Sequence, residues 1–184
     1  ESFTKENTMN LKMLKAAFAG LVLSVSGFAN AGLIFTFTED GGDVTMTSSG
    51  SIDTSGLLIG ASAGWGGTGI EENGNHDIMG GTSFGGTDTF FGFNAGTDYS
   101  QWASATGPFS SDFFSFSLTG GSKSFATFLW ESGIQTPGLS IVSSDLVGTI
   151  WASDQSWLAT SQTFASIGMI AGTYTVTDAL SSEF

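Results

Sequence analysis

The sequence predicts an all-β protein, built as a single antiparallel β-sandwich of the jelly-roll-like or Ig-like kind with Gly-rich loops. Three observations support this prediction. After Gly32, apolar residues recur at every second position in short runs, which is the period of a half-buried strand. Gly-rich turns separate these runs, and the chain contains 27 glycines but only 2 prolines. No helical period is evident in this part, and short strands at such spacing are typical of sandwiches and barrels.

Residues 1–31 are predicted to be a leader that precedes this domain. The apolar run from Ala16 to Phe28 follows Lys12 and Lys15 and is followed by the small-residue triplet Ala29-Asn30-Ala31. A transmembrane helix needs roughly 20 apolar residues, whereas the core of a signal peptide needs only about 7 to 15. We therefore expect a helical signal peptide of the Sec type, cleaved after the triplet. The signal peptide itself is expected to start at Met9 or Met13.

The remainder, residues 32–184, is expected to form one β domain that does not span a membrane. It holds one lysine, Lys123, against fifteen acids and no arginine, so its net charge is about −14. Nucleic acid binding needs lysine and arginine to neutralise phosphates, which excludes this class of partner. The absence of cysteine excludes disulfides, zinc thiolate sites and cysteine nucleophiles. A chain of this size can fold without such staples, because about 150 residues bury roughly 68–70 % of their unfolded surface.

A first hairpin is predicted near the start of this domain. Residues 33–38 and 43–47 alternate between apolar and polar side chains, and Glu39-Asp40-Gly41-Gly42 lies between them. Asp-Gly and Gly-Gly supply the positive φ values that tight hairpin turns require. Alternate residues of the two strands, beginning at Leu33 and Val44, should face the core.

A second hairpin is predicted to join residues 113–118 to residues 125–130 through Gly120-Gly121. The same alternation and the same turn chemistry support it. The stretch 60–86 is expected to be a loose excursion from the sheet. Further strands are expected at residues 52–59, 90–93, 139–142, 146–152, 157–164 and 173–177.

The nucleophile-elbow pattern of hydrolases, G-x-S-x-G, occurs around Ser62 and Ser83. Glycine and serine are so frequent here that such matches arise by chance, and neither lies between an apolar strand and a helix as the elbow requires. The single histidine, His76, precedes Ser83, whereas the α/β-hydrolase order places histidine after serine. No catalytic residue is assigned, and we expect the protein not to be an enzyme.

The densest polar cluster is Glu71-Glu72-Asn73-Gly74-Asn75-His76-Asp77. Oxygen ligands on a glycine-broken loop suit calcium, which takes six to eight of them. The spacing of an EF-hand is absent, and residues 66–71 match only the start of a calcium β-roll repeat, without a second copy. A solvated surface loop is the other interpretation. No metal ligand or cofactor-binding residue is assigned, no cofactor is predicted, and a structural calcium ion stays open.

The five tryptophans offer two readings. Aromatic faces can stack on sugar rings, but most tryptophans of a small β domain belong to its core. Exposed coplanar tryptophans would favour glycan binding, and fully buried ones would exclude it. The residues concerned are Trp65, Trp102, Trp130, Trp151 and Trp157.

Residues 34–57, IFTFTEDGGDVTMTSSGSIDTSGL, and residues 163–179, TFASIGMIAGTYTVTDA, resemble bacterial PEP-CTERM proteins, the exported substrates of exosortase systems. Such proteins carry a signal peptide, a low-charge β domain rich in Gly, Ser and Thr, and a sorting tail with a Pro-Glu-Pro triplet, an apolar span and basic residues. The resemblance implies that residues 32–184 stop before one last strand and this tail, which are not in the chain.

The resemblance further implies export through the inner membrane of a Gram-negative bacterium, with signal peptidase and exosortase as processing partners. The expected destination is the cell surface or the extracellular polymeric matrix. We therefore expect a non-catalytic surface or matrix protein. The alternative is a carbohydrate-binding module acting on extracellular polysaccharide, with or without a structural calcium ion.

Overall fold

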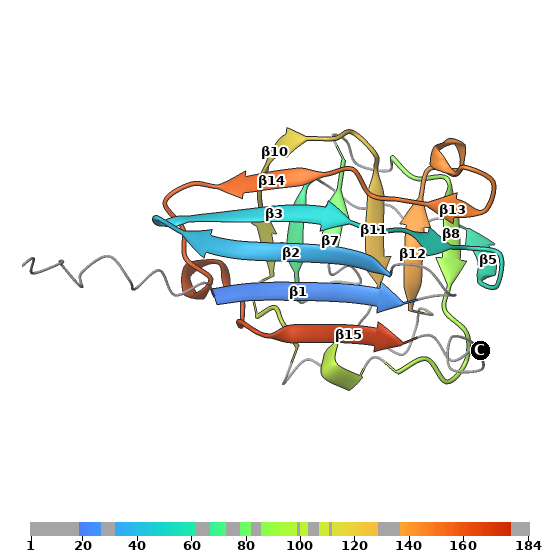
Figure 1. The fold of residues 1–184 in the computed structure, drawn as a ribbon, viewed down its shortest axis with the longest axis horizontal. Coiled ribbons are helices and arrows are strands. Elements are labelled where there is room, and N and C mark those ends of the chain that lie inside the picture. Colours follow the sequence, from blue (N-terminus) through green and yellow to red (C-terminus); the bar gives the residue numbers. More distant parts are fainter. Residues whose placement is uncertain are drawn as a thin grey trace, which may run out of the picture.

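A computed structural model describes most of residues 32–184 and one segment of the predicted leader. Its strands form an all-β sandwich, which confirms the predicted fold class. In Figure 1 the strands of the front sheet run across those of the sheet behind it, which is the orthogonal type of sheet packing. The residues described are 19–26, 32–61, 67–72, 78–81, 86–98, 100–102, 107–110, 112–128 and 137–177.

The first sheet has six strands. Every pair in it is antiparallel except the last, β1 with β15, which is parallel. In spatial order the strands are β10 (Ser117–Gly120), β14 (Ser156–Ala159), β3 (Asp43–Ser49), β2 (Leu33–Asp40), β1 (Ala19–Ser26) and β15 (Thr173–Thr177).

The second sheet has seven antiparallel strands. Their order is β5 (Leu58–Ala61), β8 (Thr89–Gly92), β12 (Gly138–Ile141), β11 (Phe125–Phe128), β7 (Ile78–Gly80), β6 (Gly69–Glu71) and β9 (Phe113–Ser115). The short strands β4 (Ile52–Asp53) and β13 (Ile150–Trp151) pair with each other. The short 3₁₀ helices are η2 (Ser100–Trp102), η3 (Ser143–Asp145) and η4 (Ala165–Ile167).

The first predicted hairpin is confirmed. β2 and β3 pair up to Asp40 opposite Asp43, so the turn itself is Gly41-Gly42. Both glycines have positive φ, 63° and 88°, the left-handed conformation that a two-residue hairpin turn requires. Inside the hairpin, alternate residues are buried from Leu33 onward in β2 and from Val44 onward in β3, as the period of two predicts.

The second predicted hairpin is wrong. Residues 113–118 divide at Phe116 into β9, which pairs with β6 in the second sheet, and β10, which pairs with β14 in the first. β11 lies in the second sheet between β12 and β7, away from β10. The physical reason is that Phe116 is buried where the chain crosses between the two sheets. A strand that changes sheet presents the same apolar alternation as one arm of a hairpin.

Three predicted strands are shorter than expected. The run 52–59 is split into β4 and β5 by a turn in which the Leu57 N–H donates to the Thr54 carbonyl at 3.1 Å. Of the run 146–152 only β13 is a strand, and the run 157–164 ends with β14 before a turn in which Ser161 has a φ of 56°.

The other predicted strands fit the structure better. β8, β12 and β15 lie within one residue of the ranges 90–93, 139–142 and 173–177. The stretch 60–86 is not wholly an excursion, because it includes β6 and β7 of the second sheet.

The predicted helix of the leader is wrong for residues 19–26, which form β1. This strand pairs antiparallel with β2 from Ala19 to Val25 and parallel with β15 from Val22 to Ser26. Its sequence, AGLVLSVS, has apolar residues at every second position, Leu21, Leu23 and Val25, which is the period of a strand. This segment can therefore form a strand between β2 and β15 instead of a helix. None of the helices in the described ranges has the length and apolarity needed to cross a bilayer.

The core between the sheets is aromatic. Phe125 of β11 stacks on Phe35 of β2, with ring centroids 5.3 Å apart, and also contacts Trp151 and Trp157. These four side chains are at most 1 % exposed. Gly80 of β7, the pairing partner of Phe125 within the second sheet, must lack a side chain, because a Cβ there would clash with the Phe125 ring and with the Gln155 side chain, which precedes β14 of the first sheet.

Candidate functional site

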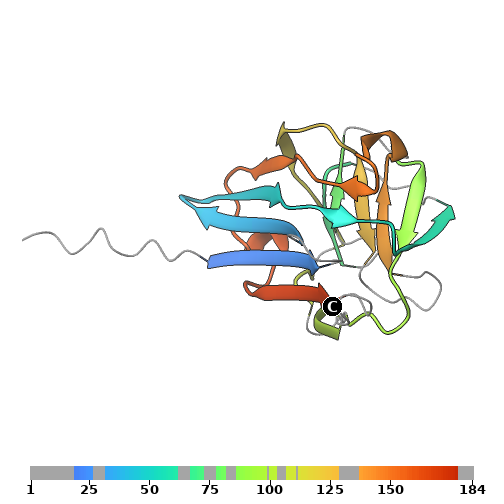
Figure 2. The same ribbon diagram turned by 45° about the vertical axis from the view of Figure 1, so that its right-hand side comes forward.

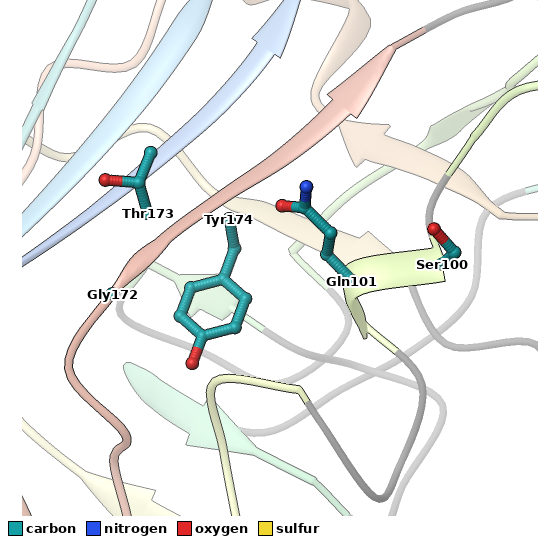
Figure 3. A pocket seen from close by; sticks show the side chains of 5 residues that line it. All are labelled: Ser100, Gln101, Gly172, Thr173 and Tyr174. Atoms are coloured by element: carbon teal, nitrogen blue, oxygen red, sulfur yellow. The ribbon is translucent and has the colours of Figure 1, made fainter.

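The candidate site is an open pocket of about 420 Å³ at the edge of the first sheet, between η2 and the start of β15. Figure 3 shows the Gln101 side chain reaching from η2 towards β15, with the Tyr174 ring beside it. Among the described residues, those that line the pocket carry no charge; they are Ser100, Gln101, Gly172, Thr173 and Tyr174. Hydroxyl, amide and phenol groups therefore define its chemistry.

One hydrogen bond shapes η2 and another joins it to β15. The Asp98 carboxylate accepts the Ser100 N–H at 3.0 Å, which starts the 3₁₀ turn. The Gln101 Oε1 then accepts the Thr175 N–H at 2.9 Å, on the edge of β15 that faces away from β1. This bond satisfies a backbone donor that the end of the sheet would otherwise expose.

Tyr174 forms the apolar wall of the pocket. Its ring packs against Trp102 at 6.1 Å and its hydroxyl donates to the Ile170 carbonyl at 3.4 Å. Burial raises the pKa of the Tyr174 phenol above its ordinary value, so the group stays neutral at physiological pH. Gly172 must lack a side chain, because a Cβ there would lie 2.9 Å from this ring.

Carboxylates of the described residues hold the protein's own backbone. Five of them accept a backbone N–H at 3.0 Å or less: Glu39 from Phe164, Asp43 from Ser161, Asp53 from Ser55, Asp88 from Ser143, and Asp98 from Ser100. Each bond joins a strand or a loop to a neighbouring turn. These acids therefore have a structural role, because they hold the loops and turns in place.

The same bonds lower the pKa of three aspartates. Backbone donation from Ser55, Ser143 and Ser100 is the main cause for Asp53, Asp88 and Asp98, respectively. A lowered pKa keeps a carboxylate ionised at neutral pH. A general acid working at neutral pH needs the opposite shift.

Three of the five tryptophans are buried and cannot form a surface that binds sugars. Trp102, Trp151 and Trp157 are 3 %, 0 % and 1 % exposed, so none of them can stack on a sugar ring. Trp65 and Trp130 lie outside the described residues.

Other residues singled out in the sequence also lie outside the described ranges. They include Ser62, Ser83 and His76, together with residues 73–77 of the polar cluster. Glu71 ends β6, and Glu72 follows it. The described part of the chain brings together no group of three or more metal-ligating side chains. A calcium ion on the polar loop stays a prediction.

The pocket residues were not candidates from the sequence. Ser100 and Gln101 are 72 and 71 positions from Gly172 in the chain, and only the packing of η2 on β15 makes them neighbours. A local signal exists for the turn alone, since an aspartate two residues before a serine favours this type of turn.

Comparisons of the chain with protein-family models, with curated proteins and with solved structures found no match.

Proposed function

We propose that this chain is an exported, non-catalytic protein of the cell surface or extracellular matrix of a Gram-negative bacterium. The observation that carries the proposal is the three-part leader, with Lys12 and Lys15, an apolar run, and the triplet Ala29-Asn30-Ala31. The resemblance to PEP-CTERM proteins supports the same destination and adds exosortase as a processing partner.

Two features of the domain support a non-catalytic role. The carboxylates described above bind backbone amides, and the described residues that line the pocket at η2 are uncharged. Charged residues are 11 % of the chain, so the polarity of the surface depends on hydroxyl and amide groups. Such a surface hydrogen-bonds water and polysaccharide, and a net charge of about −14 keeps it away from anionic surfaces.

The test is the N-terminus of the protein in its native host. We expect mass spectrometry to find a chain that begins at Gly32 and fractionates with the cell surface or the matrix. Ala31→Asp should leave the leader attached, because signal peptidase requires a small residue at this position. Ala17→Leu, which lies within the apolar run, is the matched control and should be processed normally. An intact chain dissolved in the cell interior would refute the proposal.

A second candidate function is carbohydrate binding, and the pocket at η2 favours it. An aromatic wall with hydroxyl and amide donors around it suits a neutral, hydroxylated ligand. Tyr174 would supply the apolar wall, while Ser100, Gln101 and Thr173 would supply hydrogen bonds. The buried tryptophans take no part.

Binding can be measured with neutral tetrasaccharides of glucose, galactose or mannose, using an oligogalacturonate as the acidic comparison. We expect weak binding of a neutral sugar, and Thr173→Val should weaken it about 2- to 10-fold, the value of one hydrogen bond. Thr47→Val, on the exposed side of β3, should leave the affinity unchanged. If the parent protein, Thr173→Val and Thr47→Val bind the sugar with equal affinity, this pocket is not the binding site.

A further inference from the structure

β1 occupies a position that the proposed processing would empty. It lies between β2 and β15 in the first sheet, as Figures 1 and 2 both show, yet its residues belong to the leader. The inference below rests on the proposed removal of residues 1–31. Without β1, one edge of β2 and one edge of β15 would lose their backbone partners, and the gap between them would expose two rows of unpaired backbone groups, which native proteins usually pair or cover.

We propose that removal of the leader lets β15 pair directly with β2, which closes the first sheet from six strands to five. The occupant of the emptied position is thus a segment of the same chain. Strand direction, register and the anchoring of β15 support this inference independently.

The strand directions already suit direct pairing. β1 is antiparallel to β2 and parallel to β15, so β15 runs antiparallel to β2. The pairing of β1 with β15 is the one parallel pair among the described strands. Direct pairing would replace it with an antiparallel pair like all the others.

The register suits it as well. Leu23 of β1 pairs with Tyr174 on one side and with Phe35 on the other, so these two residues lie at the same height in the sheet. In the same way, Val25 places Val176 at the height of Leu33. Tyr174 and Val176 are buried, as are the two residues of β2. A sideways shift of one strand spacing, about 4.8 Å, would therefore keep buried residues opposite buried residues. A register displaced by one residue would turn them outward.

The connections of β15 permit this shift. Its N-terminal approach is held at Ile170, whose N–H donates to the Pro108 carbonyl at 2.9 Å, and Ala171 and Gly172 lie between this anchor and the strand. The hydrogen bond from Thr175 to Gln101 lies on the far edge of β15, so direct pairing with β2 would not compete for the same backbone group. The same bond shows that the N–H of Thr175 points away from β1, and by the alternation of a strand so does that of Thr173.

A disulfide between Thr36→Cys and Thr173→Cys tests the closure. With β1 between them, these positions lie about 9.5 Å apart, two strand spacings, which is too far for a disulfide. After closure they become a pair without mutual hydrogen bonds, about 4.5 Å apart, which allows one. The chain has no cysteine of its own, so no other disulfide competes.

The full chain is made with a protease site inserted after Ala31. Half of the protein is cleaved and freed of its leader in urea, the other half stays intact in urea, and both are refolded and oxidised. In the cleaved protein we expect the cysteine pair to form a disulfide within each chain, so that both free thiols disappear. In the intact protein we expect both thiols to stay free. The control pair Thr36→Cys/Thr47→Cys joins β2 to its existing neighbour β3 and should close in both samples.

Four results would overturn the inference. They are a disulfide in both samples, a disulfide in neither, crosslinks only between two cleaved chains, and failure of the control pair in the cleaved chain, which would mean that it does not fold. The outcome is separate from that of the proposed function. A chain found uncleaved in its host would refute the proposed export even if the cleaved domain closes in vitro.

Discussion

Phe125→Ala is expected to lower the free energy of unfolding by about 3–5 kcal/mol. Phe125 of the second sheet is 0 % exposed and contacts Phe35 at 5.3 Å and Trp157 at 6.3 Å, both in the first sheet, and Trp151 of β13 at 5.4 Å. Alanine would leave a cavity among large rings that cannot collapse into it. Since a domain is stable by only about 5–15 kcal/mol, the loss is a large share of the total.

Urea denaturation of the variant and the parent measures this loss directly. Phe125→Leu fills most of the cavity and should cost roughly half as much or less. Val147→Ala is the surface control, because Val147 is 81 % exposed, and its effect should stay within about 0.5 kcal/mol. If Phe125→Ala is no more destabilising than Val147→Ala, the aromatic contact between the sheets is not as described.

Gln155→Leu is expected to cost about 2–4 kcal/mol, because it removes a buried polar link at the start of β14. The Gln155 Oε1 accepts the Trp157 Nε1–H at 2.6 Å, and its Nε2 donates to the Lys123 carbonyl. Both Gln155 and Trp157 are nearly fully buried, at 2 % and 1 % exposed. Leucine has a similar volume but leaves an indole donor and a carbonyl acceptor without partners.

A double-mutant cycle with Trp157→Phe separates hydrogen bonding from packing. Phenylalanine has no donor, so the double variant should be more stable than the sum of the single losses predicts, by about 1–2 kcal/mol. The backbone bonds of Gln155 to Ser48 remain in every variant, which keeps β14 next to β3. Gln162→Leu, at a half-buried position, should cost less than about 1 kcal/mol. Strict additivity in the cycle would contradict the link between the two side chains.

The prediction of strands succeeded where local chemistry is sufficient. Gly41-Gly42 specifies its turn because only positive φ fits a two-residue hairpin, and Leu33, Phe35 and Phe37 specify the buried face of β2 by their period. The prediction failed for residues 113–118 because the period of two does not say which sheet a strand joins. Phe116 is apolar and buried in either topology, and only its position between the sheets separates β9 from β10.

The candidate site could not be found from the sequence for a similar reason. Gln101 and Thr175 form one of its defining bonds across a sequence separation of 74 residues. Neither residue carries a distinctive signal, because glutamine and threonine are ordinary surface residues. The close approach of Gly80 to Gln155 is equally invisible in the sequence, because it depends on how the two sheets pack.

The sequence by itself determined the all-β class and the first hairpin, because these depend on the period of the strands and on turn residues. The leader and the exclusion of nucleic acid stay predictions from pattern and charge. Tertiary structure decided which strands are neighbours, where residues 19–26 lie, and which side chains line the pocket at η2. These outcomes depend on the competition between distant segments for the same strand edges and the same core. That competition is settled by the free energy of the whole packed sandwich.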